Sequence, residues 1–266
     1  MSNGPEKGGL LNVSGLTNRY GAMRAEGDLS FEVAKGEVLG IGGPNGAGKT
    51  TLFDVISGIS RSTAGGILFL GEDRLRLPPD GLCHLGVAET LSVHAVFDTM
   101  TVRENLRCSA YFGARNRIVP SLRFDRAASE QADEALEVVG LQAHAGRTAS
   151  SLPILQRKLL MLASAIASRP ALLLLDEPVG GLNAKEIEQC AAVFRRLRDF
   201  HGMTIILIEH VMSFMTALAD RVMILHHGRK LYEGSAAGLA DDEEVVEVYL
   251  GVSGTSDIKA AMAGAG

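Results

Sequence analysis

The chain has 266 residues, of which 46 % are hydrophobic, and its formal net charge at pH 7 is −5. This length and composition allow a full hydrophobic core and fit one large domain or two lobes. The negative charge excludes a global electrostatic attraction to nucleic acid, so we expect no nucleic-acid partner.

The cysteines and the apolar runs of the sequence bear on its compartment. Cys83, Cys108 and Cys190 are scattered and odd in number, which is typical of free thiols in a reducing compartment. The opening MSNGPEKGG has no apolar core of signal-peptide type. The longest apolar run, ALLLL at 171–175, is far shorter than the roughly 20 residues that span a bilayer. We therefore expect a cytosolic chain that associates with a membrane only through a partner.

The first third of the chain is rich in short β-type runs. Residues 10–41 contain such runs between Gly and Asn turns, which predict a small antiparallel sheet leading into a buried strand at 38–41. A helix is expected at 50–57, and a further strand after the Gly65–Gly66 turn.

The middle third has a helical pattern instead. TVRE at 101–104 is a capping-box sequence, and Ala132, Leu136 and Val139 recur at helical spacing. We expect a helical lobe over residues 101–147.

The last part of the chain alternates strands with helices, which predicts a mostly parallel sheet covered by helices. A hairpin should turn at His227–Gly228, and residues 251–266 are small and polar enough for a loose tail. The expected elements are helices at 155–168, 184–200 and 241–250 and strands in ALLLLDEP and TIILIEH.

The segment GPNGAGKTT at 43–51 matches the phosphate-binding pattern G-x-x-x-x-G-K-[ST] between a strand and a helix. Glycines let backbone N–H groups curl around phosphate oxygens. Lys49 would place its charge on the β- and γ-phosphates, and Thr50 would offer a hydroxyl to Mg²⁺. A turn that only joined strand to helix would not need the Lys-Thr pair.

LLLLDEP places Asp176 and Glu177 at the carboxyl end of a buried strand, where ligands of open α/β sheets bind. Asp176 would reach Mg²⁺ through water, and Glu177 would polarise the attacking water. His210, at the end of TIILIEH, could hydrogen-bond the γ-phosphate, although a lone histidine is more often structural. Tyr20 could stack on a base or could simply pack within its own lobe.

Tyr20, the 43–51 loop, LLLLDEP, GLNAKE and His210 together resemble the ATP-binding subunit of an ABC transporter over about residues 10–250. More narrowly, RENL, SLP, LIEHVM, DRVMILHHG and EVVEVYLG look like the branched-chain amino acid import ATPases of bacteria. The resemblance implies an α/β P-loop NTPase core of ABC type, an N-terminal antiparallel β subdomain and an inserted helical subdomain at about 93–157. Residues 1–9 and 251–266 would be flexible ends.

The resemblance also implies the roles of individual residues. Glu177 would be the base and His210 the γ-phosphate sensor. Mg²⁺ would be held by Thr50, Asp176 and Ser92. The nucleotide-binding set would be Tyr20, Gly43, Pro44, Asn45, Gly46, Gly48, Lys49, Thr50, Thr51, Leu155 and Gln156.

Two positions depart from the family pattern. The signature is commonly L-S-G-G-Q, whereas this chain has Leu152, Pro153, Ile154, Leu155 and Gln156. Leu155 replaces the glycine that lets the backbone approach the partner's γ-phosphate, and we expect its side chain to crowd the nucleotide. Ser92 aligns with a family glutamine and is too short to make the same contact without a bridging water.

The sequence thus predicts the ATPase subunit of a bacterial importer for branched-chain amino acids or a related small solute. It would lie peripherally on the cytoplasmic face of the inner membrane, with permease subunits, a second ATPase subunit and a solute-binding protein as partners. ATP and Mg²⁺ would be required, and hydrolysis would be impaired in a homodimer. The alternative is a degenerate nucleotide-binding subunit with a regulatory or structural role, which Leu155 and Ser92 favour and Glu177 and His210 oppose.

Overall fold

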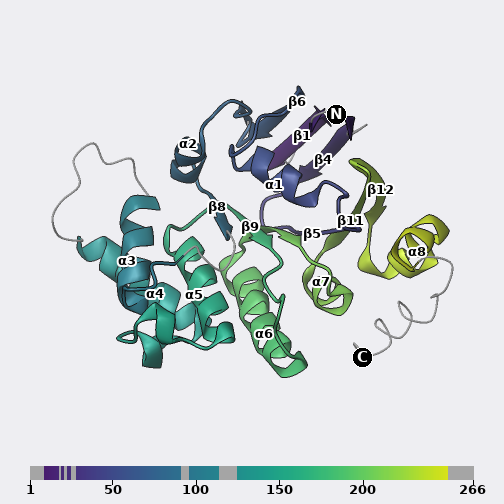
Figure 1. Ribbon diagram of the computed structural model, residues 1–266. Coiled ribbons are helices and arrows are strands. Elements are labelled where there is room, and N and C mark those ends of the chain that lie inside the picture. The colour runs from purple at the N-terminus through teal and green to yellow at the C-terminus, as the bar shows by residue number, and fades with distance from the viewer. Residues whose placement is uncertain are drawn as a thin grey trace, which may run out of the picture. The chain divides into compact units, whose positions relative to one another are not determined.

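The computed structural model describes residues 9–17, 19–20, 23–24, 28–90, 96–113 and 125–250 (Figure 1). The chain divides into two compact units. The first unit comprises residues 1–78 and 202–266, and the second comprises residues 79–201.

The first unit contains an antiparallel sheet and a set of buried strands that carry helices. Its elements are β1 (Leu11–Thr17), β2 (Arg19–Tyr20), β3 (Met23–Arg24), β4 (Leu29–Val33), β5 (Val38–Gly42), α1 (Lys49–Ile56), β6 (Ala64–Phe69), β7 (Glu72–Asp73), β10 (Thr204–Ile208), α7 (Met212–Leu218), β11 (Arg221–His226), β12 (Arg229–Gly234) and α8 (Glu243–Leu250).

The predicted N-terminal antiparallel sheet is confirmed, with strand order β4-β1-β6-β7. β1 pairs antiparallel with both β4 and β6. Alternate residues of β4 are buried and exposed, which is the pattern of a sheet with one face on a core and one face toward solvent.

The remaining strands of the first unit run in the order β12-β11-β5-β10. β5 is parallel to both β10 and β11, and the β11–β12 hairpin turns at His227–Gly228 as predicted. Every residue of β5 and of β10 is buried. Continuous burial is expected of parallel strands covered on both faces, because apolar side chains then leave water in both directions.

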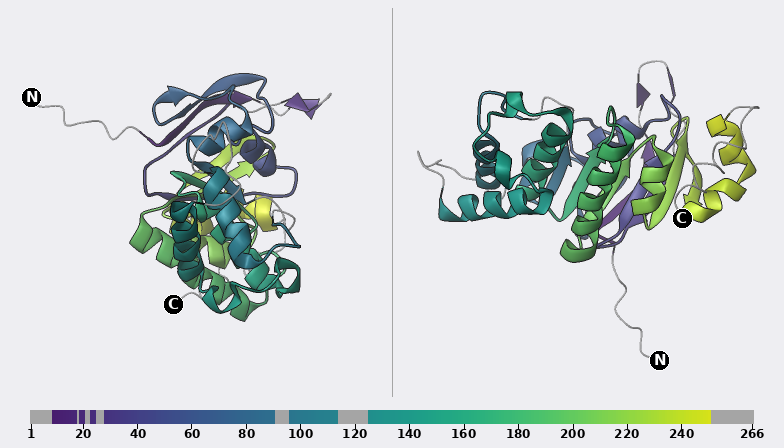
Figure 2. Two further views of the ribbon diagram at one scale, coloured as in Figure 1. Left: turned by 90° about the vertical axis from the view of Figure 1, so that its left-hand side faces the viewer. Right: turned by 90° about the horizontal axis from the view of Figure 1, so that it is seen from below.

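The second unit is mostly helical, as predicted for residues 101–147. Its elements are α2 (Pro79–His84), β8 (Val87–Thr90), α3 (Val102–Gly113), α4 (Arg126–Val139), α5 (Ile154–Ala167), β9 (Leu172–Asp176), α6 (Ala184–His201) and two short 3₁₀ turns. β8 and β9 are parallel neighbours. Helices α3, α4 and α5 lie side by side in every view (Figures 1 and 2).

Local sequence signals explain where these helices begin and end. The Asp125 carboxylate accepts a hydrogen bond from the Ala128 N–H at 2.8 Å and caps the start of α4. Gly140 ends that helix in the left-handed conformation, with φ at 74°. The capping box is confirmed at α3, where the Glu104 carboxylate accepts the Thr101 N–H at 2.8 Å and the Thr101 hydroxyl accepts the Glu104 N–H at 3.2 Å.

Other elements test the remaining predictions. The three helices expected after residue 154 are present as α5, α6 and α8, with ends shifted by at most two residues. Helices α2 and α7 and strand β8 had not been predicted from the sequence. All three cysteines are free, and burial raises the pKa of the Cys83 and Cys108 thiols.

The capping box of α3 should make stability depend on pH. Hydrogen bonds from the Thr101 N–H and hydroxyl hold the pKa of the Glu104 carboxyl below 4.5. The contribution of the ionised carboxylate is therefore complete above 4.5, the unfolded value, and disappears as the pH falls through the lower folded value. Glu104→Gln keeps the cap geometry but cannot titrate. As the pH is lowered from above 4.5 to below the folded pKa of Glu104, we therefore expect the urea midpoint of unfolding to fall less in the variant than in the wild type. Equal losses in the two proteins would contradict this role for Glu104.

Candidate nucleotide-binding site

The P-loop, residues 43–51, connects β5 to α1 through three glycines with left-handed backbone. Their φ angles are 144° at Gly43, 80° at Gly46 and 102° at Gly48. At Gly43 an added Cβ would lie 2.2 Å from the carbonyl oxygen of Leu225 in β11. Only glycine fits there, because this separation is far below van der Waals contact and the backbone angle is unfavourable for any L side chain.

Lys49 begins α1 and turns its ammonium back into the P-loop. Its residue is 6 % exposed, and Nζ donates to the carbonyl oxygens of Gly43 at 2.7 Å and Pro44 at 3.0 Å. The loop thus holds a concentrated positive charge beside backbone donors, the arrangement that binds phosphate. Thr50 is exposed on the first turn of α1 and Thr51 is half-buried, while Asn45 and Gly46 are exposed at the tip of the loop.

His210 lies at the same edge of the first unit as the P-loop. β10 and β5 are parallel and pair Ile208 with Ile41, so both chains leave the sheet at the same end. The Glu209 carboxylate is 1 % exposed and accepts the N–H groups of His210 at 2.8 Å and Val211 at 3.0 Å. This buried carboxylate, which the sequence analysis did not single out, fixes the backbone that presents the exposed His210.

The turn between β11 and β12 supports the P-loop from the side. The Gly228 N–H donates to the Ala47 carbonyl at 2.9 Å, and Gly228 Cα lies 3.7 Å from the position of a Cβ on Gly48. The loop is therefore held by backbone contacts on two sides, from β11 and from the hairpin turn.

In the second unit, β9 delivers Asp176 and Glu177 as predicted. Leu172 to Leu175 are completely buried, whereas Asp176 is half-buried and Glu177 is exposed. Glu177 has a φ of 47°, rare for a residue other than glycine, and its carbonyl accepts the Gly180 N–H at 3.2 Å.

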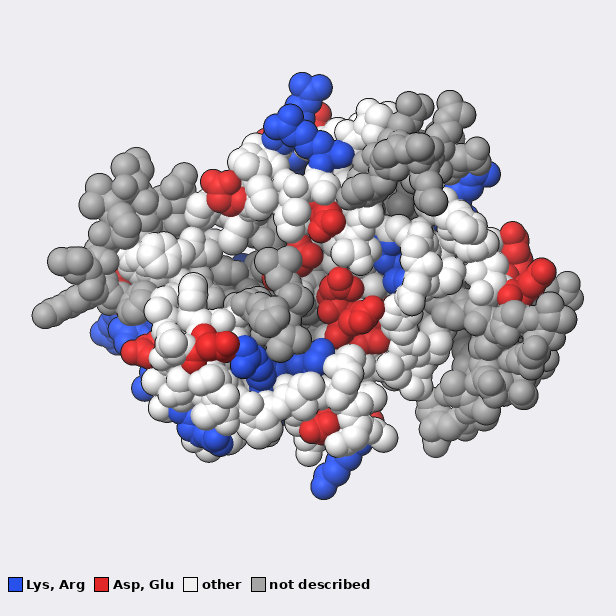
Figure 3. Space-filling view, viewed as in Figure 1, with Lys and Arg blue, Asp and Glu red and all other residues white. Residues whose placement is uncertain are grey.

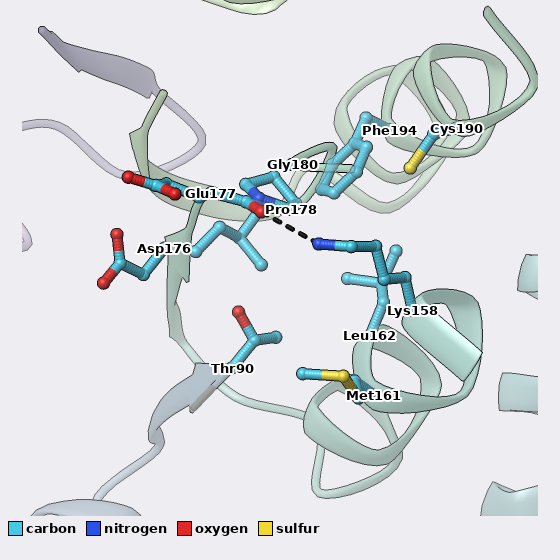
Figure 4. Close-up of a pocket in the computed structure, with 11 residues that line it drawn as sticks. Thr90, Lys158, Met161, Leu162, Asp176, Glu177, Pro178, Gly180, Cys190 and Phe194 are labelled. Carbon is cyan, nitrogen blue, oxygen red and sulfur yellow. Dashed lines mark hydrogen bonds between the residues drawn. The ribbon is translucent and has the colours of Figure 1, made fainter. Parts of the chain in front are cut away.

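A cavity of about 380 Å³ lies within the second unit, beside the end of β9. Thr90, Met161 and Phe194 line it together with Lys158, whose ammonium donates to the Glu177 carbonyl at 3.1 Å. The carboxylates of Asp176 and Glu177 point away from Lys158 (Figure 4). Lys158 and Thr90 were not predicted as cavity residues from the sequence, because neither belongs to a motif. Lys158 lies two residues after Gln156 of the signature.

The signature segment corrects one expectation. The Leu155 side chain is 5 % exposed and points into the second unit, whereas Ile154 is 45 % exposed. Leu155 shares the buried face of α5 with Leu159 and Leu162, which follow at helical spacing. The prediction that the Leu155 side chain crowds the nucleotide is therefore wrong. The apolar side chain at the surface is Ile154, whose Cδ1 lies 3.5 Å from a Cβ built on Gly181.

The start of α5 has an unusual polar arrangement. Pro153 is its N-cap and provides no side-chain hydrogen bond. Gln156 Oε1 is buried and accepts no hydrogen bond from any residue that the structure describes.

The structure does not describe the side chains of two predicted site residues. Ser92 lies outside the described residues. Tyr20 falls in the two-residue strand β2, but its side chain is not among those described.

Each unit, taken by itself, has groups of the kind that bind a magnesium nucleotide. The first unit provides a glycine cradle, a buried ammonium and a threonine hydroxyl, which suit a polyphosphate and a hard cation. The second unit provides two carboxylates at a strand end, the oxygen ligands that Mg²⁺ prefers. On the face shown in Figure 3, the described Lys and Arg residues lie in separate small groups with acidic residues between them.

Comparison with protein families gives one match. The family model described as ABC transporter matches residues 27–180, which include the P-loop, the signature segment and both carboxylates. Within the described residues, no helix has the length and hydropathy to cross a membrane.

Individual relatives agree with the family model. The high-affinity branched-chain amino acid transport ATP-binding protein LivG of Escherichia coli (strain K12) is 35 % identical over 91 % of this chain and 98 % of its own length. BraF of Pseudomonas aeruginosa, with the same description, is 34 % identical over the same shares. The sulfate/thiosulfate import ATP-binding protein CysA of Mycobacterium tuberculosis (strain CDC 1551 / Oshkosh) is 35 % identical over 86 % of this chain but 62 % of its own length.

Solved structures show the same fold. A nucleotide-free ATP-binding cassette from an ABC transporter has a TM-score of 0.81 and 26 % identity, covering 91 % of this chain and 99 % of its own. An ATP-binding cassette of an ABC transporter in its ADP conformation gives 0.81 and 27 % over the same shares.

The buried position of Leu155 makes a stability test possible at the signature. Leu155→Gly removes a buried side chain and adds a helix glycine, so we expect unfolding to become easier by about 3–5 kcal/mol. Ile154→Gly at the adjacent exposed position should cost about 1 kcal/mol. Denaturant unfolding of both variants measures the difference. Similar costs at the two positions would show that Leu155 does not belong to the core.

Proposed function

This chain belongs to the ABC transporter family as the ATP-binding subunit of an importer, and from that premise we propose that it powers uptake of branched-chain amino acids or a related small solute. The observation that carries the choice of solute is the match to LivG, which extends over 98 % of that protein. CysA is equally identical, but only 62 % of it is covered, so its solute is the weaker candidate.

The P-loop would bind the phosphates of ATP. Lys49 would move its ammonium from the carbonyls of Gly43 and Pro44 to the β- and γ-phosphate oxygens, a short shift because these carbonyls belong to the same loop. The exposed N–H groups around Gly46 would donate to the same oxygens, and Tyr20 would stack on the adenine. Pro44, Asn45, Gly48 and Thr51 complete the predicted loop set.

The remaining site residues would handle the metal and the attacking water. Thr50, Asp176 and Ser92 would hold Mg²⁺, which when bound neutralises charge on the phosphates. Glu177 would accept a proton from the attacking water. His210, on the backbone fixed by Glu209, would donate to the γ-phosphate and distinguish ATP from ADP.

The signature segment bears on the partner. In this family two ATPase subunits enclose ATP between one subunit's P-loop and the other's signature. Here Pro153 and Ile154 occupy the exposed start of α5, and a proline lacks the N–H and hydroxyl that a serine would offer. We propose that a second, non-identical ATPase chain provides the signature for the site built on Lys49, and that the assembly works peripherally with a permease on the cytoplasmic face of the membrane. A solute-binding protein would deliver the solute.

A pair of variants separates binding from hydrolysis. Lys49→Met should weaken ATP binding about tenfold or more, since hydrogen bonds to charged groups contribute roughly 1.5–3 kcal/mol. Glu177→Gln should bind ATP like the wild type and hydrolyse it about 100- to 10 000-fold more slowly, because the proton acceptor is lost. Equilibrium binding and steady-state hydrolysis in the complex with the second ATPase chain give both values. A wild type that binds ATP but never hydrolyses it in the complex would favour the degenerate regulatory subunit instead.

Uptake by cells tests the solute. Cells that lack this chain should lose accumulation of labelled leucine and regain it with the wild-type chain but not with Lys49→Met. Sulfate uptake in the same cells is the control and should not change. Loss of sulfate uptake with normal leucine uptake would overturn the proposed solute class.

A further inference from the structure

Lys158 of α5 contacts the backbone of Glu177 directly. Its ammonium donates to the Glu177 carbonyl at 3.1 Å across 19 residues of sequence. Figure 4 shows the side chain reaching from α5 along the cavity to the chain that follows β9. The same carbonyl accepts the Gly180 N–H at 3.2 Å, so both donors meet at one oxygen.

This carbonyl belongs to a residue in an unfavourable conformation. Glu177 has a φ of 47°, and left-handed backbone at a residue other than glycine persists only where the surroundings hold it. The Gly180 N–H closes a turn onto the carbonyl from within the loop. Lys158 adds the stronger, charge-assisted donor from a separate helix, and so links the loop to a rigid element.

The helix that carries Lys158 is itself firmly placed. Leu159 and Leu160 follow it in sequence and are buried, and the preceding Arg157 pairs with Asp98 at 2.5 Å. The Arg157 side chain is 17 % exposed. Lys158 therefore projects from a turn of α5 that is fixed on both sides, which suits a residue that must hold another group in place.

We infer that Lys158 is a positioning residue for Glu177. Its ammonium holds the left-handed turn at Glu177 from one side, and this directs the carboxylate to the other side, away from Lys158. The inference rests on the proposed function, in which Glu177 accepts the proton of the attacking water. It assigns to α5 a second task, because the helix that starts at the signature also sets the geometry of the carboxylate in its own subunit.

The test compares two substitutions at Lys158 with a surface control. Lys158→Met keeps the apolar stem along the cavity and removes the donors, while Lys158→Arg keeps a cation that can reach the carbonyl. Arg126→Met removes a cation whose side chain is 92 % exposed on α4. The wild type and all three variants are assayed in the complex with the second ATPase chain for ATP affinity, KM and kcat. Amide hydrogen exchange of residues 177–182 is measured on the same proteins.

We expect Lys158→Met to lower kcat about ten- to a hundredfold, since small misplacements of a reacting group have effects of this size. ATP affinity and KM should stay at the wild-type values, and exchange at 177–182 should become faster. Lys158→Arg should restore most of kcat and of the protection, and Arg126→Met should behave like the wild type.

Two results would overturn the inference. The first is wild-type kcat and exchange in Lys158→Met. The second is a loss that Lys158→Arg does not restore and that accompanies a general loss of stability, which would indicate a merely structural role. Failure of the proposed function is distinct, because Glu177→Gln would then hydrolyse ATP like the wild type.

Discussion

The parallel pairing of β5 with β10 and β11 is the constraint on which the site in the first unit depends. It aligns Ile41 with Ile208 and Gly42 with Ile224, so three chains leave the sheet at one edge. These three strand ends are followed in the chain by the P-loop, His210 and the His227–Gly228 turn. The same pairing explains Gly43, because a strand neighbour whose carbonyl would lie 2.2 Å from a Cβ leaves no room for one. The neighbouring carbonyl of Leu225 and the backbone angle of Gly43 thus require glycine at this position for two independent reasons.

Much of this arrangement could be predicted from the sequence, because it depends on local patterns. Glycine spacing, a lysine-threonine pair and buried strands that end in charged residues are short-range signals. The TVRE box and the hairpin turn were also local, and both are present. α2 and α7, with six and seven residues, are too short to show a helical period, and β8 has only four residues.

The direction of side chains in the signature segment could not be obtained from motif alignment. Alignment identifies Leu155 with the family glycine, but it does not say which face of the helix that position occupies. The helical spacing of Leu155, Leu159 and Leu162 does predict the direction of the Leu155 side chain, since it places all three on the buried face of α5. The Lys158–Glu177 contact has no such signal, because it joins a helix to a loop in the unusual left-handed conformation.

The burial of Leu155 suggests why an altered signature can persist. Glycine within a helix is less favourable than leucine by roughly 1 kcal/mol, and burying a leucine side chain contributes about 2 kcal/mol more. The chain therefore gains stability at the position where the family uses glycine for close approach to the partner's nucleotide. If the proposed second ATPase chain retains its own signature, the phosphates bound at Lys49 still meet an intact signature. The sequence of α5 can then favour packing and the placement of Glu177. The contact of its signature with a nucleotide is no longer required, whereas the contact of Lys158 with Glu177 still is.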